Sequence, residues 1–169
     1  DTFSAGGAWP KVIAVAPDEA TAYVSNWESK TVTAIDTATR AVVARIPTGG
    51  IPRGMAFSRD ARFLYVCRYE PGALLKVDLA AAAVVKTVDV GPSALRHVVL
   101  HPAREVLYVS DLLRGRVYAV DAATDAVIAA AFVDHSLNTL KLAPDGGSVF
   151  VCSRGPNNPV DWTTKGPLF

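Results

Sequence analysis

Hydrophobic residues along this chain come in short runs that are separated by polar turns. Each run is five or six residues long, is rich in Val, Ile, Thr or Tyr, and is bounded by Pro, Asp, Asn or Gly, a pattern typical of β-strands. In the first 46 residues we predict strands over residues 11–16, 21–26, 31–35 and 41–46. Runs such as residues 12–15 and 97–100 have apolar residues on both faces of the strand, so we expect a sheet that is covered on both faces.

The runs repeat with a period of about 42 residues. Four equivalent aromatic residues, separated by steps of 42, 43 and 42, mark the repeat: Tyr23, Tyr65, Tyr108 and Phe150. An aliphatic–aspartate pair keeps the same register at Asp36, Asp78 and Asp121. Four short antiparallel strands per repeat, with sheet stacked on sheet, are typical of a β-propeller blade. We therefore predict an all-β propeller whose repeated aromatic residues lie in the blade cores and whose repeated aspartates fix turns.

The first repeat resembles a known family. Tyr23-Val24-Ser25-Asn26, followed by Val32-Thr33-Ala34-Ile35-Asp36 and Val42-Val43-Ala44-Arg45-Ile46, is similar to the YVTN-type β-propeller repeat of surface-layer and periplasmic proteins. Arg68, Asp111 and Ser153 replace the Asn of the motif in the later repeats. The resemblance implies a bacterial or archaeal extracytoplasmic protein (periplasmic, cell-surface or secreted), and it says little about chemistry because the fold hosts many functions.

The period divides the chain into parts of one propeller domain. We expect the end of a preceding blade at 1–8, blade 1 at 9–50, blade 2 at 51–91, blade 3 at 92–135, and an incomplete blade 4 with a Pro/Asn-rich loop at 136–169. The N-terminal strand could complete the last blade and close a four-bladed ring. We favour instead a fragment of a larger propeller, of about seven blades by the family resemblance. Its open ends would then need the missing blades, a protein partner or a second copy.

The overall charge is nearly balanced, with 17 Lys and Arg against 16 Asp and Glu. This balance gives no reason to expect a mainly electrostatic nucleic-acid binder. The strand order nevertheless separates the charges between the two ends of the blades. Cations outnumber anions in the loops from second to third strands and between blades, which we call the upper face. Anions outnumber cations in the tight turns of the lower face.

The sharpest candidate site is on the upper face. Lys11, Arg53, Arg96 and Asn138 enter the innermost strand at the same place in each repeat, so a propeller brings them together at the mouth of its central channel. Arg offers a planar donor fork that suits carboxylate or phosphate. We predict an anion-binding site there, ringed by Trp27, Arg68, Tyr69 and Arg154. Two alternatives stay open: the cations pair with neighbouring carboxylates or stay solvated, and the aromatic residues, with Trp9 and Trp162, cap the space between blades.

Other residues with reactive side chains have simpler structural interpretations. Cys67 and Cys152 are equivalent positions two blades apart, too distant for a disulfide, and we expect inert core thiols. His97 and His101 lack further ligands at a usable spacing, and His101 replaces small turn residues of the other repeats. We predict no catalytic residue, no metal site and no cofactor.

These observations favour a non-enzymatic binding or scaffold propeller that takes an anionic small ligand or a protein partner. No apolar run reaches the ~18 residues of a membrane span. One alternative is an enzyme, since the repeats also resemble lactonase-type propellers, with His101-Pro102, and the propellers of haem- or quinone-linked oxidoreductases. Another is a single-stranded nucleic-acid binder, for which exposed aromatic and basic residues would be the stacking surface.

Overall fold

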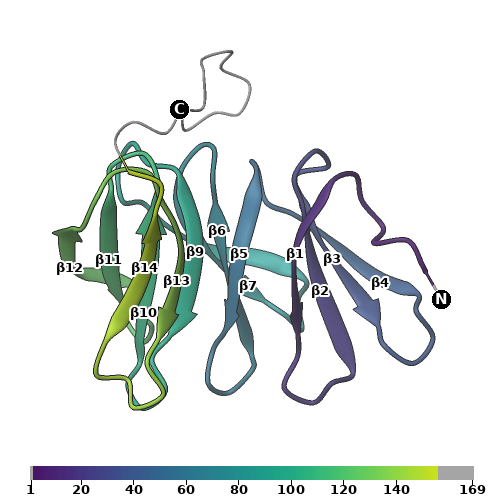
Figure 1. The fold of residues 1–169 in the computed structure, drawn as a ribbon. Helices are drawn as coiled ribbons and strands as arrows, with labels where there is room; N and C mark the ends of the chain where they lie inside the picture. The colour runs from purple at the N-terminus through teal and green to yellow at the C-terminus, as the bar shows by residue number, and fades with distance from the viewer. Residues whose placement is uncertain (1, 156–169) are drawn as a thin grey trace.

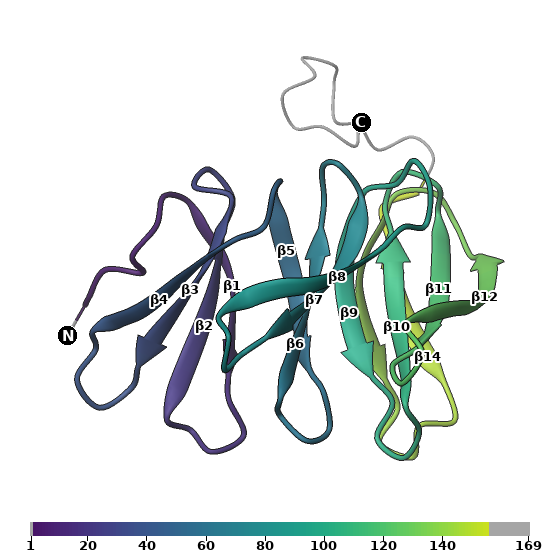
Figure 2. The same cartoon turned by 180° about the vertical axis from the view of Figure 1, so that it is seen from behind.

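The computed structural model describes residues 2–155, which form 14 antiparallel strands in four sheets. The sheets stand side by side in an open arc, each twisted relative to the next (Figures 1 and 2). Strands follow chain order within every sheet. Blade 1 contains β1 (Pro10–Val15), β2 (Thr21–Asn26), β3 (Thr31–Asp36) and β4 (Val42–Pro47). Blade 2 contains β5 (Pro52–Phe57), β6 (Phe63–Arg68), β7 (Ala73–Asp78) and β8 (Ala83–Val88).

Blade 3 has the same four-stranded order, whereas blade 4 has two strands among the described residues. Blade 3 contains β9 (Leu95–Leu100), β10 (Val106–Asp111), β11 (Arg116–Asp121) and β12 (Ala126–Phe132), and blade 4 contains β13 (Leu137–Leu142) and β14 (Val149–Ser153). The all-β propeller predicted from the repeat is therefore confirmed. The tight β1–β2, β5–β6, β9–β10 and β13–β14 hairpins lie at one end of the arc, at the bottom of Figure 1.

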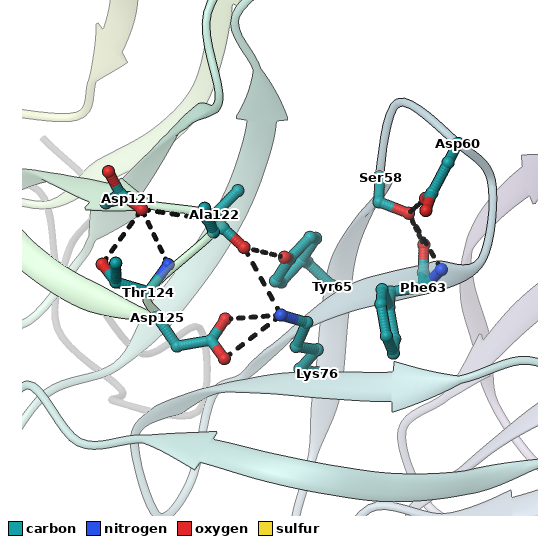
Figure 3. Close-up of polar contacts among 10 residues, drawn as sticks. Ser58, Asp60, Phe63, Tyr65, Lys76, Asp121, Ala122, Thr124 and Asp125 are labelled. Carbon is teal, nitrogen blue, oxygen red and sulfur yellow. Dashed lines mark hydrogen bonds and ion pairs between the residues drawn. The ribbon is translucent and has the colours of Figure 1, made fainter.

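The repeated aspartates fix turns, as predicted. The Asp36 carboxylate accepts hydrogen bonds from the backbone N–H (2.7 Å) and the hydroxyl of Thr39. Asp121 repeats this arrangement with Thr124 (Figure 3), and Asp78 accepts from the backbone N–H of Ala81 at 3.0 Å. These bonds stabilise the charged carboxylate, so they lower the pKa of all three aspartates.

Two apolar cores lie between adjacent blades. One joins blades 1 and 2, where Val32 and Ile46 pack with Leu75 and Val77. The other joins blades 2 and 3 and includes Tyr65, Cys67, Leu74, Leu95 and Val120. Because successive side chains of a strand point to opposite faces, Leu74 and Leu75 of β7 enter different cores. Blade 2 is thus buried on both faces. In blade 1, where the apolar run at residues 12–15 predicts the same, Ile13 and Val15 are exposed, so one face of β1 is not covered by a further described blade.

Two predictions about core residues are wrong in blade 4. Phe150 is 65% exposed and Cys152 is exposed, although Tyr23, Tyr65 and Cys67, at equivalent positions, are buried. The reason is local: β14 is the last strand that the structure describes, and no further strand covers it there.

The described N-terminal residues lie against blade 1. Residues 2–9 form no strand, and the Thr33 hydroxyl donates to the Ala5 carbonyl at 2.6 Å while Arg45 Nε donates to that of Gly6 at 3.2 Å. This segment therefore borders β3 and β4 and does not complete the β13–β14 sheet, so the arc is not closed into a four-bladed ring. The predicted Pro/Asn-rich loop, from residue 156 onwards, and Trp162 lie outside the described residues.

Candidate functional site

The predicted channel-mouth residues share one backbone feature. Lys11, Arg53, Arg96 and Asn138 are each the second residue of β1, β5, β9 and β13. In all four innermost strands the pairing register shifts at this place. Such irregularities bend a strand and re-aim the side chain of the extra residue. Because neighbouring innermost strands pack in the order β1, β5, β9 and β13, the fold places the four positions along one line.

Aromatic side chains lie between the cations. The Lys11 ammonium is 4.7 Å from the ring centroid of Trp9 and 5.7 Å from that of Trp27. The Arg53 guanidinium is 5.0 Å from the Trp27 centroid, and that of Arg96 is 5.9 Å from the Tyr69 centroid. These distances are in the range of cation–π attraction.

The rings also contact one another. The centroids of Trp9 and Trp27 are 6.3 Å apart, and those of Trp27 and Tyr69 are 5.3 Å apart. We call Trp9, Lys11, Trp27, Arg53, Tyr69 and Arg96 the basic–aromatic row. It runs continuously from blade 1 to blade 3.

The two arginines of the row are partly removed from water without a carboxylate partner. Burial lowers the pKa of Arg53 and lowers that of Arg96 to about 10, and the positive charge of Arg154 contributes to both shifts. Among residues 2–155, no ion pair involves Arg53 or Arg96. The buried Nε of Arg96 also has no hydrogen-bond partner there. Among the described residues, neighbouring carboxylates therefore do not pair with these two arginines, in contrast to one of the alternatives above.

The other predicted site residues differ in their placement. Arg154 follows β14 and lies near enough to Arg53 and Arg96 to act on both electrostatically. Asn138 occupies its expected strand position, and its backbone carbonyl accepts a hydrogen bond from the Ser110 hydroxyl at 2.7 Å. Arg68 is outside the row: its Nε donates to the Pro71 carbonyl at 2.6 Å and its Nη1 to that of Thr48 at 3.4 Å, so it joins two loops.

Sequence reasoning missed the pairing of each cation with a ring. Trp9 stands two residues before Lys11, and Trp27 and Tyr69 each directly follow the second strand of their blade. The regular spacing was visible, but which ring meets which cation depends on the twist between blades. Trp9 was not part of the predicted site. Its contacts with Lys11 and Trp27 lengthen the row at the blade 1 end.

The reactive side chains outside the row are used structurally. The buried His101 accepts hydrogen bonds at Nδ1 from the backbone N–H groups of Ala103 and Arg104, both at 3.0 Å, and so caps its turn. Burial raises the pKa of the Cys67 thiol, which keeps it in the unreactive protonated form. Among the described residues no three His, Cys, Asp or Glu side chains gather as a metal site would require, and no helix is long and apolar enough to cross a membrane.

The arc of stacked four-stranded sheets defines the chain as part of a β-propeller. Comparison with known proteins gives the same fold but no family, since no family model matches. Over 170 residues the chain is 28% identical to Antigen Lp49 of Leptospira interrogans, covering 97% of this chain and 37% of that protein.

Two solved structures share the fold. Hydrazine synthase of Kuenenia stuttgartiensis superposes with a TM-score of 0.82 at 23% identity, over 87% of this chain and 42% of that one. The dihydro-heme d1 dehydrogenase NirN, solved in complex with DHE, superposes with a TM-score of 0.71 at 24% identity, over 86% and 33%. The chain thus spans less than half of each relative, and its blades correspond to part of a larger propeller.

Proposed function

We propose that this chain is the ligand-binding arc of a non-enzymatic, extracytoplasmic β-propeller and that the basic–aromatic row binds an anion. The observation that carries the proposal is the pair Arg53 and Arg96, which are half-buried, adjacent and without an acidic partner among the described residues. Buried charges are normally paired. A bound carboxylate or phosphate would supply the missing negative charge and accept bidentate hydrogen bonds from the guanidinium groups.

The position of the row supports the same proposal. It lies on the innermost strands, at the ends where the chain enters them, and these strands border the central channel of a propeller. Low-dielectric walls around a channel mouth focus the field of such charges and raise the local concentration of an anion. The tight turns at the opposite end of the blades contain Asp36, Asp78 and Asp121, so opposite charges gather at the two ends of the blades.

The extracytoplasmic location rests on two similarities. The first repeat resembles the YVTN-type propellers of surface layers and the periplasm, and the relative from Leptospira interrogans is named an antigen. An antigen has to be reached by antibodies, which supports a location outside the cytoplasm. A protein partner with an acidic segment would use the same row as a small anion.

The proposal is tested by titrating the purified protein with citrate and with inorganic phosphate at fixed ionic strength, using calorimetry. We expect saturable binding that is weakened at least about tenfold, or about 1.4 kcal/mol, in Arg53→Gln and Arg96→Gln. Lys86→Gln is the matched control, because it removes one exposed cation of the outer strand β8, away from the row. If Arg53→Gln and Arg96→Gln bound both anions as tightly as the control Lys86→Gln does, the proposal would be contradicted.

A further inference from the structure

We infer that the row, together with Arg154, selects a multivalent oxyanion, which these residues bind by charge across blades 2, 3 and 4 and not by stacking of a ring. This inference rests on the proposed function and deepens it by naming the ligand class. It is carried by three observations: the number of arginines that meet, the contacts of the aromatic rings, and a buried donor without a partner.

Three arginines from three blades lie within electrostatic reach of one another at one end of the row. Arg53 comes from β5, Arg96 from β9, and Arg154 follows β14. The charges of Arg53 and Arg154 both disfavour the charged form of Arg96, so the three groups repel one another. A ligand with one negative charge would leave most of this repulsion in place. A ligand with several oxyanion groups would neutralise the arginines together, and its affinity should rise with each charge.

The aromatic rings already have partners. Trp27 has four neighbours within the row: the cations of Lys11 at 5.7 Å and Arg53 at 5.0 Å, and the rings of Trp9 at 6.3 Å and Tyr69 at 5.3 Å. Tyr69 lies between Trp27 and the guanidinium of Arg96. A nucleobase would have to displace these contacts in order to stack. The rings are therefore positioning residues that hold the cations in place, which lowers the entropic cost of binding.

A donor in the row lacks an acceptor. The Nε of Arg96 is buried and has no hydrogen-bond partner among the described residues. Buried polar groups in native proteins are nearly always hydrogen-bonded. A ligand oxygen that reached this guanidinium would satisfy the donor, as phosphate and carboxylate oxygens do in bidentate pairs. This observation places the centre of the expected site at Arg96, between Arg53 and Arg154.

The test is an affinity series measured with the purified protein at fixed ionic strength. The probes are phosphate, pyrophosphate, tripolyphosphate, citrate and ATP. We expect affinity to rise about tenfold or more from phosphate to tripolyphosphate, and ATP to bind no more tightly than tripolyphosphate. Citrate distinguishes the two classes of ligand that carry several oxyanion groups. Tighter binding of citrate than of tripolyphosphate assigns a polycarboxylate, and the reverse assigns a polyphosphate.

Variants separate charge from stacking. Arg154→Gln should reduce the gain from phosphate to tripolyphosphate, because Arg154, the residue after β14, then no longer contributes a charge. Trp27→Leu should weaken tripolyphosphate and ATP equally. Equal affinity for phosphate and tripolyphosphate would overturn the inference while leaving anion binding intact. Tighter binding of ATP that disappears in Trp27→Leu would also overturn it, in favour of stacking. Failure of every anion to bind would instead contradict the proposed function itself.

Discussion

The Nζ of Lys76 lies 3.0 Å from Oδ1 and 3.1 Å from Oδ2 of Asp125, and this ion pair joins β7 of blade 2 to the β11–β12 turn of blade 3 (Figure 3). The two side chains are only 12% and 14% exposed. Lys76 also donates to the Ala122 carbonyl at 3.4 Å, which accepts at 3.0 Å from the Tyr65 hydroxyl as well. The pair is therefore one part of a polar contact between two blades.

Removing one partner of this pair should destabilise the protein. Lys76→Ala leaves the Asp125 carboxylate shielded from water without a counter-charge, and such changes cost about 3 kcal/mol. The measurement is the free energy of unfolding from denaturant titration. The double variant Lys76→Met/Asp125→Asn should recover much of the loss, because no orphaned charge remains and Asn tolerates the left-handed backbone at this position (φ 59°). Lys86→Gln serves as the exposed control, and a loss in that control as large as in Lys76→Ala would refute the explanation.

Gly54 should not tolerate a side chain. A Cβ at this position would lie 2.7 Å from the Cα of His97 and 2.8 Å from the carbonyl oxygen of Arg96, both on the neighbouring innermost strand β9. Because these are backbone atoms, β5 and β9 would have to separate. We expect Gly54→Ala to cost about 1–3 kcal/mol and to weaken anion binding by displacing Arg53 and Arg96.

A second glycine provides the comparison for this prediction. At Gly147 the nearest atoms to an added Cβ belong to the carboxylate of Asp145, at 3.3 Å, and this side chain can move. Gly147→Ala should therefore change the thermal unfolding midpoint little. If Gly54→Ala were as stable as Gly147→Ala, the close approach of the two innermost strands would not be what requires glycine.

Loss of Arg96 should stabilise the fold while it weakens ligand binding. Burial, followed by the charges of Arg53 and Arg154, lowers the pKa of Arg96 to about 10 from 12.5. At neutral pH the group is charged in the folded and the unfolded chain, so the folded state pays the full electrostatic cost there. Since the folded-state pKa is the lower one, this cost fades only as pH rises above about 10.

Arg96→Met should therefore raise the free energy of unfolding of the ligand-free protein at pH 7. Denaturant titration without any anion measures this gain, and the titration repeated with tripolyphosphate should show the original protein gaining more than the variant. A variant that is less stable than the original without ligand would show that the contact of Arg96 with the Tyr69 ring outweighs the cost of its buried charge.

Acid should weaken the turns through Asp36, Asp78 and Asp121. Backbone N–H donors, led by those of Thr39, Ala81 and Thr124, lower the three pKa values below the ordinary 3.8. The stabilisation is present above the unfolded-state pKa and is lost as pH falls through the folded-state values, because the unfolded chain then binds more protons.

Replacing all three aspartates by Asn keeps an oxygen acceptor and removes the titration. We expect the thermal midpoint of the triple variant to fall less steeply between pH 5 and pH 2 than that of the original protein. The control is Asp18→Asn, which changes a carboxylate that accepts one local hydrogen bond, from the Ala20 N–H at 3.0 Å. An unchanged slope in the triple variant would contradict the assigned role.

The blade architecture could be predicted because every repeat obeys the same spacing, and the aspartate turns because their hydrogen bonds are local. The motif position occupied by Asn26, Arg68, Asp111 and Ser153 could not be predicted in the same way. In the structure each of these residues contacts the segment that leads into its own blade. Arg68 Nη1 donates to the Thr48 carbonyl, the Asp111 carboxylate accepts from the Ala94 N–H at 3.0 Å, and the Ser153 hydroxyl donates to the His135 carbonyl at 2.8 Å. Asn26 packs against Gly7.

These four side chains perform one task with different chemistry, so the departure of Arg68 from the motif has a structural explanation. The exposure of Phe150 shows the opposite problem. Its spacing is that of a core residue, but burial depends on a neighbouring strand that residues 2–155 do not include. The basic–aromatic row lies between these cases. Its positions follow from the repeat, whereas the stacking of Arg53 on Trp27 depends on the angle between blades.

The innermost strands each contribute one channel-mouth position, at Lys11, Arg53, Arg96 and Asn138, and this links the charge of the site to the number of repeats. Duplication of a 42-residue unit adds one such position, and an amide in place of a cation, as at Asn138, removes one charge without altering the scaffold. Net charge at the channel mouth can therefore change in integer steps during evolution. Propellers of this kind can change the anion that they prefer by gaining or losing repeats, while the cores between their blades stay the same.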